Sequence, residues 1–155
     1  MTAQATPPAD HSARQRWMSA LAKAPCERLE NAWAALAEVE RFTHLRPPET
    51  GLVMTRGRAG GSGQRFNLGE ITVTRAAVKL ADGTVGHAYV AGRNKRHAEL
   101  AAVFDALLQH PQHHDAIERE LIAPLVTAYA AARRETARKA AATKVDFFTM
   151  VRGED

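Results

Sequence analysis

The stretch between residues 52 and 91 constrains the fold most, because strand patterns follow one another there with no helical pattern between them. Residues 52–56 predict a first strand, and a glycine-rich connection, Gly57–Gly63, follows it. Asp82-Gly83 is a strong hairpin signal, and residues 85–91 predict the return strand. Strands joined without helical crossovers pair antiparallel, so the sequence predicts a meander of three to four strands.

The apolar alternation changes parity inside the second strand. Up to Thr74 it includes Ile71 and Val73, and after Thr74 it moves to Ala76 and Val78. A one-residue shift of this kind is typical of a β-bulge, which we therefore expect near Thr74.

Helical periods precede the sheet. Trp17 and Leu21 have i, i+4 spacing, Pro25 suits the first turn of a second helix, and that helix is expected to end near Glu40. Arg46-Pro47-Pro48 then predicts a break before the first strand.

Helical periods also follow the sheet. Asn94 is expected to cap a helix whose apolar stripe comprises Leu100, Val103, Phe104, Leu107 and Leu108. His110-Pro111 ends this helix, a last helical region begins near His114, and Pro124 restarts or kinks it before it reaches about Ala142. Together these patterns predict an α+β fold, with the sheet flanked by N-terminal and C-terminal helices.

The length of 155 residues suits one domain, expected over residues 13–155, after a flexible leader at residues 1–12. A single cysteine, Cys26, excludes an intramolecular disulfide, and no segment has the apolar length of a signal peptide or a membrane helix. We therefore expect a cytoplasmic protein. The net charge of +4 permits an anionic partner without requiring one.

The C-terminal segment, residues 144–155, contains two adjacent phenylalanines followed by further apolar residues. Chain ends are usually polar, and exposed apolar patches promote association. The segment is therefore expected either to pack on its own domain or to dock on another subunit. The docking candidates are Phe147, Phe148, Met150 and Arg152.

The glycines Gly60, Gly61 and Gly63 allow two interpretations. Consecutive small residues can expose amide groups that bind an anion, but a hairpin loop that needs positive φ is the favoured interpretation. The segment is not a P-loop, because no Gly-Lys-Ser/Thr follows it.

Arginines concentrate near the predicted sheet. Arg65, Arg75 and Arg93 are candidates for binding an anionic substrate or a partner carboxylate, and solvated surface arginines are the alternative. By strand parity, Arg56 and Arg58 are expected to share one face.

His97 and Glu99 lie in the first turns of the helix after Asn94, where acid/base work or an exposed first turn are the two interpretations. His110, His113 and His114 do not have convincing metal-ligand spacing, and Cys26 suits a small apolar position, so no metal site is predicted.

Several segments together resemble the G subunit, PhnG, of the bacterial carbon–phosphorus lyase system, and the resemblance runs from about Arg14 to the C-terminus. The segments are residues 49–54, 60–70, 74–78, 82–86, 92–93, 97–99, 105–107 and 145–153. The last, Val-Asp-Phe-Phe-Thr-Met-Val-Arg-Gly, is the most specific.

The resemblance implies a role in phosphonate catabolism. In that family the G, H and I subunits, with the ATPase-like L subunit, replace the adenine of ATP by an alkylphosphonate, and the J subunit later breaks the carbon–phosphorus bond. ATP and the alkylphosphonate are substrates of the complex, the nucleosidase chemistry is attributed chiefly to the I subunit, and no cofactor is expected on this chain. Expected partners are the H, I and J subunits of the core complex and functionally L.

Two other functions stay open at this point. A structural adaptor would have no residue near substrate. A nucleic-acid-binding module would use the arginine-rich sheet, but aromatic residues do not interleave with the arginines, so a nucleic acid is not an expected partner. A membrane is not expected either, because no segment has the apolar length of a membrane helix.

Overall fold

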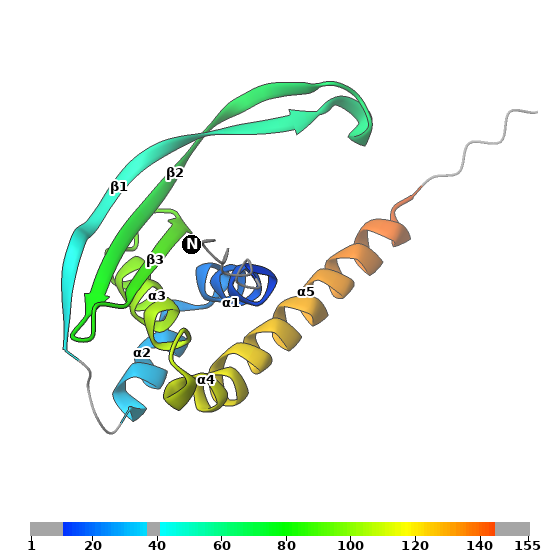
Figure 1. Cartoon of the computed structure of the whole chain (residues 1–155). Coiled ribbons are helices and arrows are strands. Elements are labelled where there is room, and N and C mark those ends of the chain that lie inside the picture. Colours follow the sequence, from blue (N-terminus) through cyan, green and yellow to red (C-terminus); the bar gives the residue numbers. More distant parts are fainter. Residues whose placement is uncertain (1–10, 37–40, 145–155) are drawn as a thin grey trace, which may run out of the picture.

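The computed structural model describes residues 11–36 and 41–144. Within them the fold is α+β, as predicted. Two helices come first along the chain, the sheet follows, and the remaining helices come after the sheet (Figure 1). The elements are α1 (His11–Lys23), α2 (Cys26–Ala35), β1 (Phe42–Arg58), a 3₁₀ turn η1 (Ala59–Gly61), β2 (Arg65–Leu80), β3 (Val85–Ala91), α3 (Lys95–Leu107), α4 (Pro111–Ile117), a π-helical turn η2 (Glu118–Ile122) and α5 (Ala123–Ala142).

The three strands form one antiparallel sheet in the order β1-β2-β3, which confirms the predicted meander. β2 pairs with β1 over its whole length, from Leu80 to Arg65. It pairs with β3 only between Val73 and Lys79. Residues 52–72 are therefore a two-stranded ribbon that extends beyond the third strand, and we call this segment the hairpin arm (Figure 1).

Strand β1 starts ten residues earlier than predicted and runs through Pro47-Pro48. Proline cannot donate a ladder hydrogen bond, and β1 tolerates it because it is an edge strand. The pairing with β2 is irregular between His44 and Arg46 and between Arg46 and Glu49, so the prolines lie in a bulged part of the strand.

The bulge expected in β2 near Thr74 is wrong. β2 pairs without interruption with β3 from Val73 to Lys79, and its own irregularity lies further out, opposite Thr55. The parity change has another cause. From Val73 onward β2 is a central strand with buried residues on both faces, whereas the residues before Thr72 are exposed.

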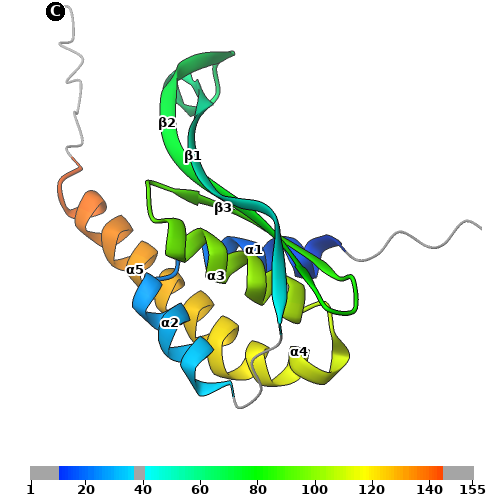
Figure 2. The same cartoon turned by 90° about the vertical axis from the view of Figure 1, so that its left-hand side faces the viewer.

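The core lies where α3 packs against β2 and β3, and α2 lies on the far side of α3 from the sheet (Figure 2). All five residues of the predicted α3 stripe are buried. Asn94 caps α3 as predicted, because its Oδ1 accepts a hydrogen bond from the amide of His97, 2.9 Å away.

Helix α2 ends at Ala35, earlier than the expected end near Glu40, and Leu36 is already extended with φ −70° and ψ 115°. Pro25 is the N-cap of this helix, immediately before its first residue. α1 begins at His11, so the last two residues of the expected leader are helical, and residues 1–10 lie outside the described part.

The last helical region begins at Pro111, three residues before the expected start, because proline suits the first turn of a helix. Pro124 follows the π-helical turn η2. Proline removes the amide that an i to i−4 bond needs, which accounts for a wider turn before α5. No described helix has both the length and the apolar character needed to span a bilayer.

Candidate functional site

The hairpin arm ends in the glycine-rich loop, and its glycines are used by the turn itself. Gly60 and Gly61 have φ values of 59° and 80°, which favour glycine. The Gly63 amide donates to the carbonyl of Ala59 at 2.9 Å, and a Cβ on Gly63 would lie 2.7 Å from that oxygen. The loop geometry thus supports the hairpin interpretation.

One face of the arm carries arginines, and we call it the arginine face. Arg58 pairs with Arg65 across the ribbon and Arg56 pairs with Asn67, so these side chains lie on the same face, as parity predicted for Arg56 and Arg58. Arg58 donates to the carbonyl of Gly63 at 3.1 Å, and Arg56 donates to the amide oxygen of Asn67 at 3.3 Å. None of the three arginines forms an ion pair within the described residues.

The opposite face of the arm is apolar, and we call it the apolar face. Val53 pairs with Ile71, and Gly57 pairs with Phe66. A Cβ on Gly57 would lie 3.7 Å from the Phe66 ring and 3.9 Å from Cβ of Leu68, which places both side chains on this face. Phe66 is 46% exposed and Leu68 is 67% exposed.

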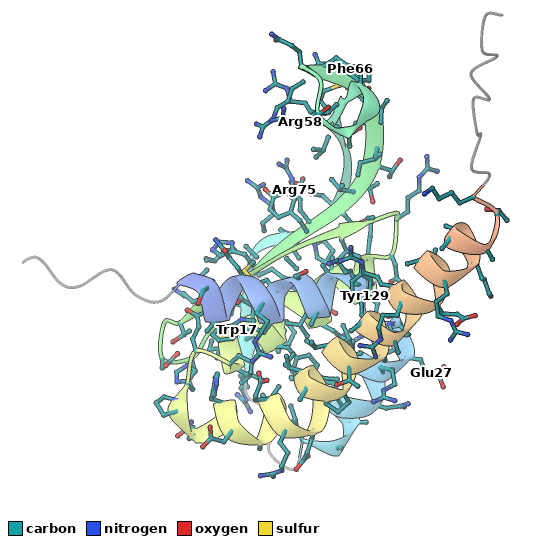
Figure 3. The ribbon with its side chains drawn as sticks, turned by 90° about the vertical axis from the view of Figure 1, so that its right-hand side faces the viewer. Trp17, Glu27, Arg58, Phe66, Arg75 and Tyr129 are labelled. Atoms are coloured by element: carbon teal, nitrogen blue, oxygen red, sulfur yellow. The ribbon has the colours of Figure 1, made fainter. Side chains whose placement is uncertain are left out.

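The arm holds most of the large apolar side chains that the described residues expose. Six of these nine residues belong to it: Leu52, Val53, Met54, Phe66, Leu68 and Ile71. By strand parity Leu52 and Met54 share the arginine face with Arg56 and Arg58, whereas the other four lie on the apolar face. Isolated surface apolar residues are common, but exposed apolar residues gathered in this way mark an interaction surface. Figure 3 shows Arg58 and Phe66 at the far end of the arm, with Arg75 nearer its base.

Arg75 borders a hollow of about 340 Å³ on the sheet, lined also by Arg46, His87 and Tyr89. Its Nε lies 2.8 Å from Glu49 Oε1, and Nε of Arg46 lies 3.5 Å from the same oxygen. Hydrogen bonding to Tyr89 and then to Glu49 raises the pKa of the Arg75 guanidinium above its ordinary value. Arg75 is therefore a charged side chain, held by its ion pair with Glu49, at an open hollow.

The other sequence candidates lie apart from the arm. His97 is buried, so the interpretation of it as part of an exposed first turn is wrong, and its Nε2 lies 2.8 Å from the carbonyl of Leu21. Glu99 accepts from His44 at 2.9 Å and pairs with Arg96, so it joins α3 to β1. Arg93 is exposed after β3.

Sequence reasoning missed the central role of Asp105, which is fully buried. Arg14 donates to both of its oxygens at 3.1 and 2.7 Å, Trp17 Nε1 donates at 2.9 Å, and the amide of His87 donates at 2.9 Å. Asp105 thus joins α1, α3 and β3. A charged residue inside the otherwise apolar stretch 100–108 was the available signal, because a buried charge needs partners.

His114 and His110 make contacts within the fold. His114 Nδ1 lies 2.8 Å from the carbonyl of Leu108, and His110 Nε2 lies 3.1 Å from Asp82. Across residues 11–36 and 41–144, no three potential metal-ligating side chains gather. Cys26 is a free thiol of intermediate exposure.

The predicted docking residues at the C-terminus lie outside the described residues. These are Phe147, Phe148, Met150 and Arg152. The described chain reaches residue 144, just after α5, whose only buried residue is Leu125.

Comparisons with known proteins agree with the earlier resemblance. Residues 12–153 match the family model described as "Phosphonate metabolism protein PhnG". A protein of Rhizobium meliloti (strain 1021), named alpha-D-ribose 1-methylphosphonate 5-triphosphate synthase subunit PhnG, is 48% identical over 142 residues, covering 92% of this chain and 90% of the relative.

Proposed function

This chain belongs to the PhnG family of phosphonate metabolism proteins, and from that premise we propose that it is a subunit of an α-D-ribose 1-methylphosphonate 5-triphosphate synthase. The assembled enzyme would transfer the ribose 5-triphosphate of ATP to an alkylphosphonate and release adenine. Its proposed companions are the H, I and J subunits, with L as a functional partner, and its proposed compartment is the cytoplasm.

The observation that carries a subunit role is the uncovered hairpin arm. Six large apolar side chains project from residues 52–72 into solvent, although the body of the same chain buries its apolar residues around α3. Water disfavours such a surface, and a companion subunit would remove it from water.

The reaction itself requires groups that the described residues do not bring together. Breaking the C1′–N9 bond of ATP and forming a C1′–O bond to the phosphonate calls for an acid near the departing adenine and for cations near the triphosphate. His97 and Glu99 are bonded to other parts of this fold. We therefore assign the acid/base step to a companion subunit.

Arg75 is the described residue best suited to bind substrate charge. It is a cation at an open hollow that also contains Arg46, and guanidinium groups bind phosphate and phosphonate oxygens well. Glu49 shares its carboxylate between the two arginines, so an anion binding here would compete with Glu49.

The test is adenine release from ATP and methylphosphonate, measured with the full chain alone, with the companions alone and with both together. We expect turnover only in the mixture, and full activity of the isolated chain would contradict a subunit role. Arg75→Met and Arg93→Met then separate substrate contact from a purely structural adaptor, with Arg119→Met as the exposed control. If both arginine variants assemble with full activity, the adaptor role is correct.

A further inference from the structure

We propose that the hairpin arm inserts between companion-subunit surfaces, with its arginine face against a carboxylate-bearing surface and its apolar face against an apolar one. The inference rests on the proposed function, because it concerns how the chain joins that enzyme. It adds a defined interface and the chemistry of the partner on each side.

The arm lacks the cover that a stable ribbon needs. A two-stranded hairpin is marginal in water without a third strand or a helix against it. The last backbone bond on the β3 side of β2 joins the Gly92 amide to the carbonyl of Thr72 at 2.8 Å, so both strand edges of the arm beyond Thr72 are open. Local bonds, such as Thr55 Oγ1 to the carbonyl of Gly69 at 2.8 Å, join the two strands without covering either face. A partner that packs on the ribbon would supply the missing cover.

Charge identifies the partner on the arginine face. Residues 52–72 contain three arginines, Arg56, Arg58 and Arg65, and a single acid, Glu70. Glu70 pairs with Met54 and so lies on the arginine face, which keeps an excess of two positive charges. The arginines have no carboxylate partner within the described residues, in contrast to Arg75, which has Glu49. An arginine fork binds carboxylates with two parallel hydrogen bonds, so a surface with clustered Asp or Glu is complementary.

A second copy of the chain fits this face poorly. In a twofold-symmetric pair the same patch meets itself, and Arg58 and Arg65 would then face arginines of the other copy. Nucleic acid also fits poorly. Single-stranded binders stack bases on aromatic rings beside their basic residues, whereas Phe66, the aromatic residue of the arm, lies on the opposite face.

The experiment measures binding of the full chain to the companion subunits assembled without it, at low and high salt. Two variants address the two faces: Arg58→Glu, and the double variant Phe66→Ser with Leu68→Ser. Matched controls are Arg119→Glu on the exposed surface of η2 and Tyr129→Ser on α5, where the tyrosine is 42% exposed. Thermal unfolding of each variant checks folding, and Arg58→Gln replaces the reversal if that variant fails to fold.

We expect Arg58→Glu to weaken binding about 10-fold at low salt, with a smaller effect at high salt because exposed charges are screened. The apolar double variant should weaken binding about 100-fold at both salt concentrations, as buried apolar anchors do. Both controls should bind as the parent chain does.

Other results overturn the inference. If the companions bind the parent chain and all arm variants equally, the interface lies elsewhere and the subunit role stands. If the companions do not bind the parent chain at all, the proposed function itself is wrong. Loss of a homodimer in the apolar variant, or loss of nucleic-acid binding in Arg58→Glu with companion binding unchanged, would identify a different occupant.

Discussion

The packed body around Asp105 and the hairpin arm differ in how their side chains are paired and buried, although β2 runs through both. In the body, a carboxylate with no solvent exposure accepts four hydrogen bonds from α1 and β3. On the arm, Arg56, Arg58 and Arg65 have no carboxylate partner among residues 11–36 and 41–144, and Leu68 is 67% exposed. The body pairs its buried carboxylate internally, whereas the arm leaves most of its charged and apolar side chains exposed.

This difference separates stability from assembly. Substitutions in the body should change the free energy of unfolding of the isolated full chain. Equivalent substitutions on the arm should leave that free energy nearly unchanged and act on assembly with the companions. Matched pairs, one residue from each region, test the separation.

The largest effect is expected for Asp105→Asn. The amide would present an NH₂ donor to groups that are themselves donors, those of Arg14, Trp17 and His87. Breaking a buried pair in this way costs about 3–5 kcal/mol. Chemical denaturation of Asp105→Asn and of Glu70→Gln on the arm gives the comparison, and a similar loss in both variants would contradict it.

Leu107→Ala and Leu68→Ala form the second pair. Leu107 is 2% exposed in the core, so truncation should destabilise the chain by about 2–5 kcal/mol. Truncation of the exposed Leu68 should stay within about 0.5 kcal/mol. Urea unfolding midpoints measure both, and a large loss in the Leu68 variant would mean that the arm packs on its own body in solution.

A third pair uses glycines. A Cβ on Gly86 would lie 1.9 Å from the carbonyl of Ala102 in α3, whereas a Cβ on Gly51 would meet nothing within 4 Å. Gly86→Ala should therefore cost about 1–3 kcal/mol through overpacking. Gly51→Ala should be neutral or slightly stabilising, because alanine loses less backbone entropy. Thermal unfolding distinguishes them, and equal melting temperatures would show that α3 can shift away from β3.

The smallest effect concerns pH and the exposed Asp82. The amide of Thr84, at 2.9 Å, lowers the pKa of Asp82. The pKa of Asp82 in the folded chain therefore lies below its unfolded value of about 3.9. Ionised Asp82 stabilises the fold above that value, and this stabilisation is lost as pH falls through the folded pKa. The stability gap between the parent chain and Asp82→Ala should narrow below about pH 4. Thr84→Val keeps the amide and should retain most of this dependence, and a gap constant with pH would contradict it.

The sequence predicted the elements whose signals are local. Asp82-Gly83 marks the second hairpin, and Asn94 bonds an amide three residues away, so both were recognisable without knowledge of the fold. Arg56 and Arg58 share a face through simple alternation.

The features that the sequence did not predict depend on distant neighbours. Pro47-Pro48 can lie within β1 only because β1 is at the sheet edge, which is a property of the strand order. His97 is buried because Leu21, 76 residues earlier, lies against it. Asp105 likewise has partners 88 and 91 residues away. Periodicity within one segment contains none of this information.

Thr74 lies at the base of the arm, where its hydroxyl contacts the neighbouring segments on both sides of β2. Its buried Oγ1 donates to the carbonyl of Gly92 at 2.7 Å and lies 3.3 Å from Oγ1 of Thr50, so one hydroxyl ties together all three strands where the third one ends. The arm beyond it is a lever about 20 Å long, and a rotation of about 10° at the base would displace the tip by about 3.5 Å. That displacement is about one residue step along a strand. The position of Arg58 at the tip is therefore sensitive to the packing of a buried threonine at the base of the arm.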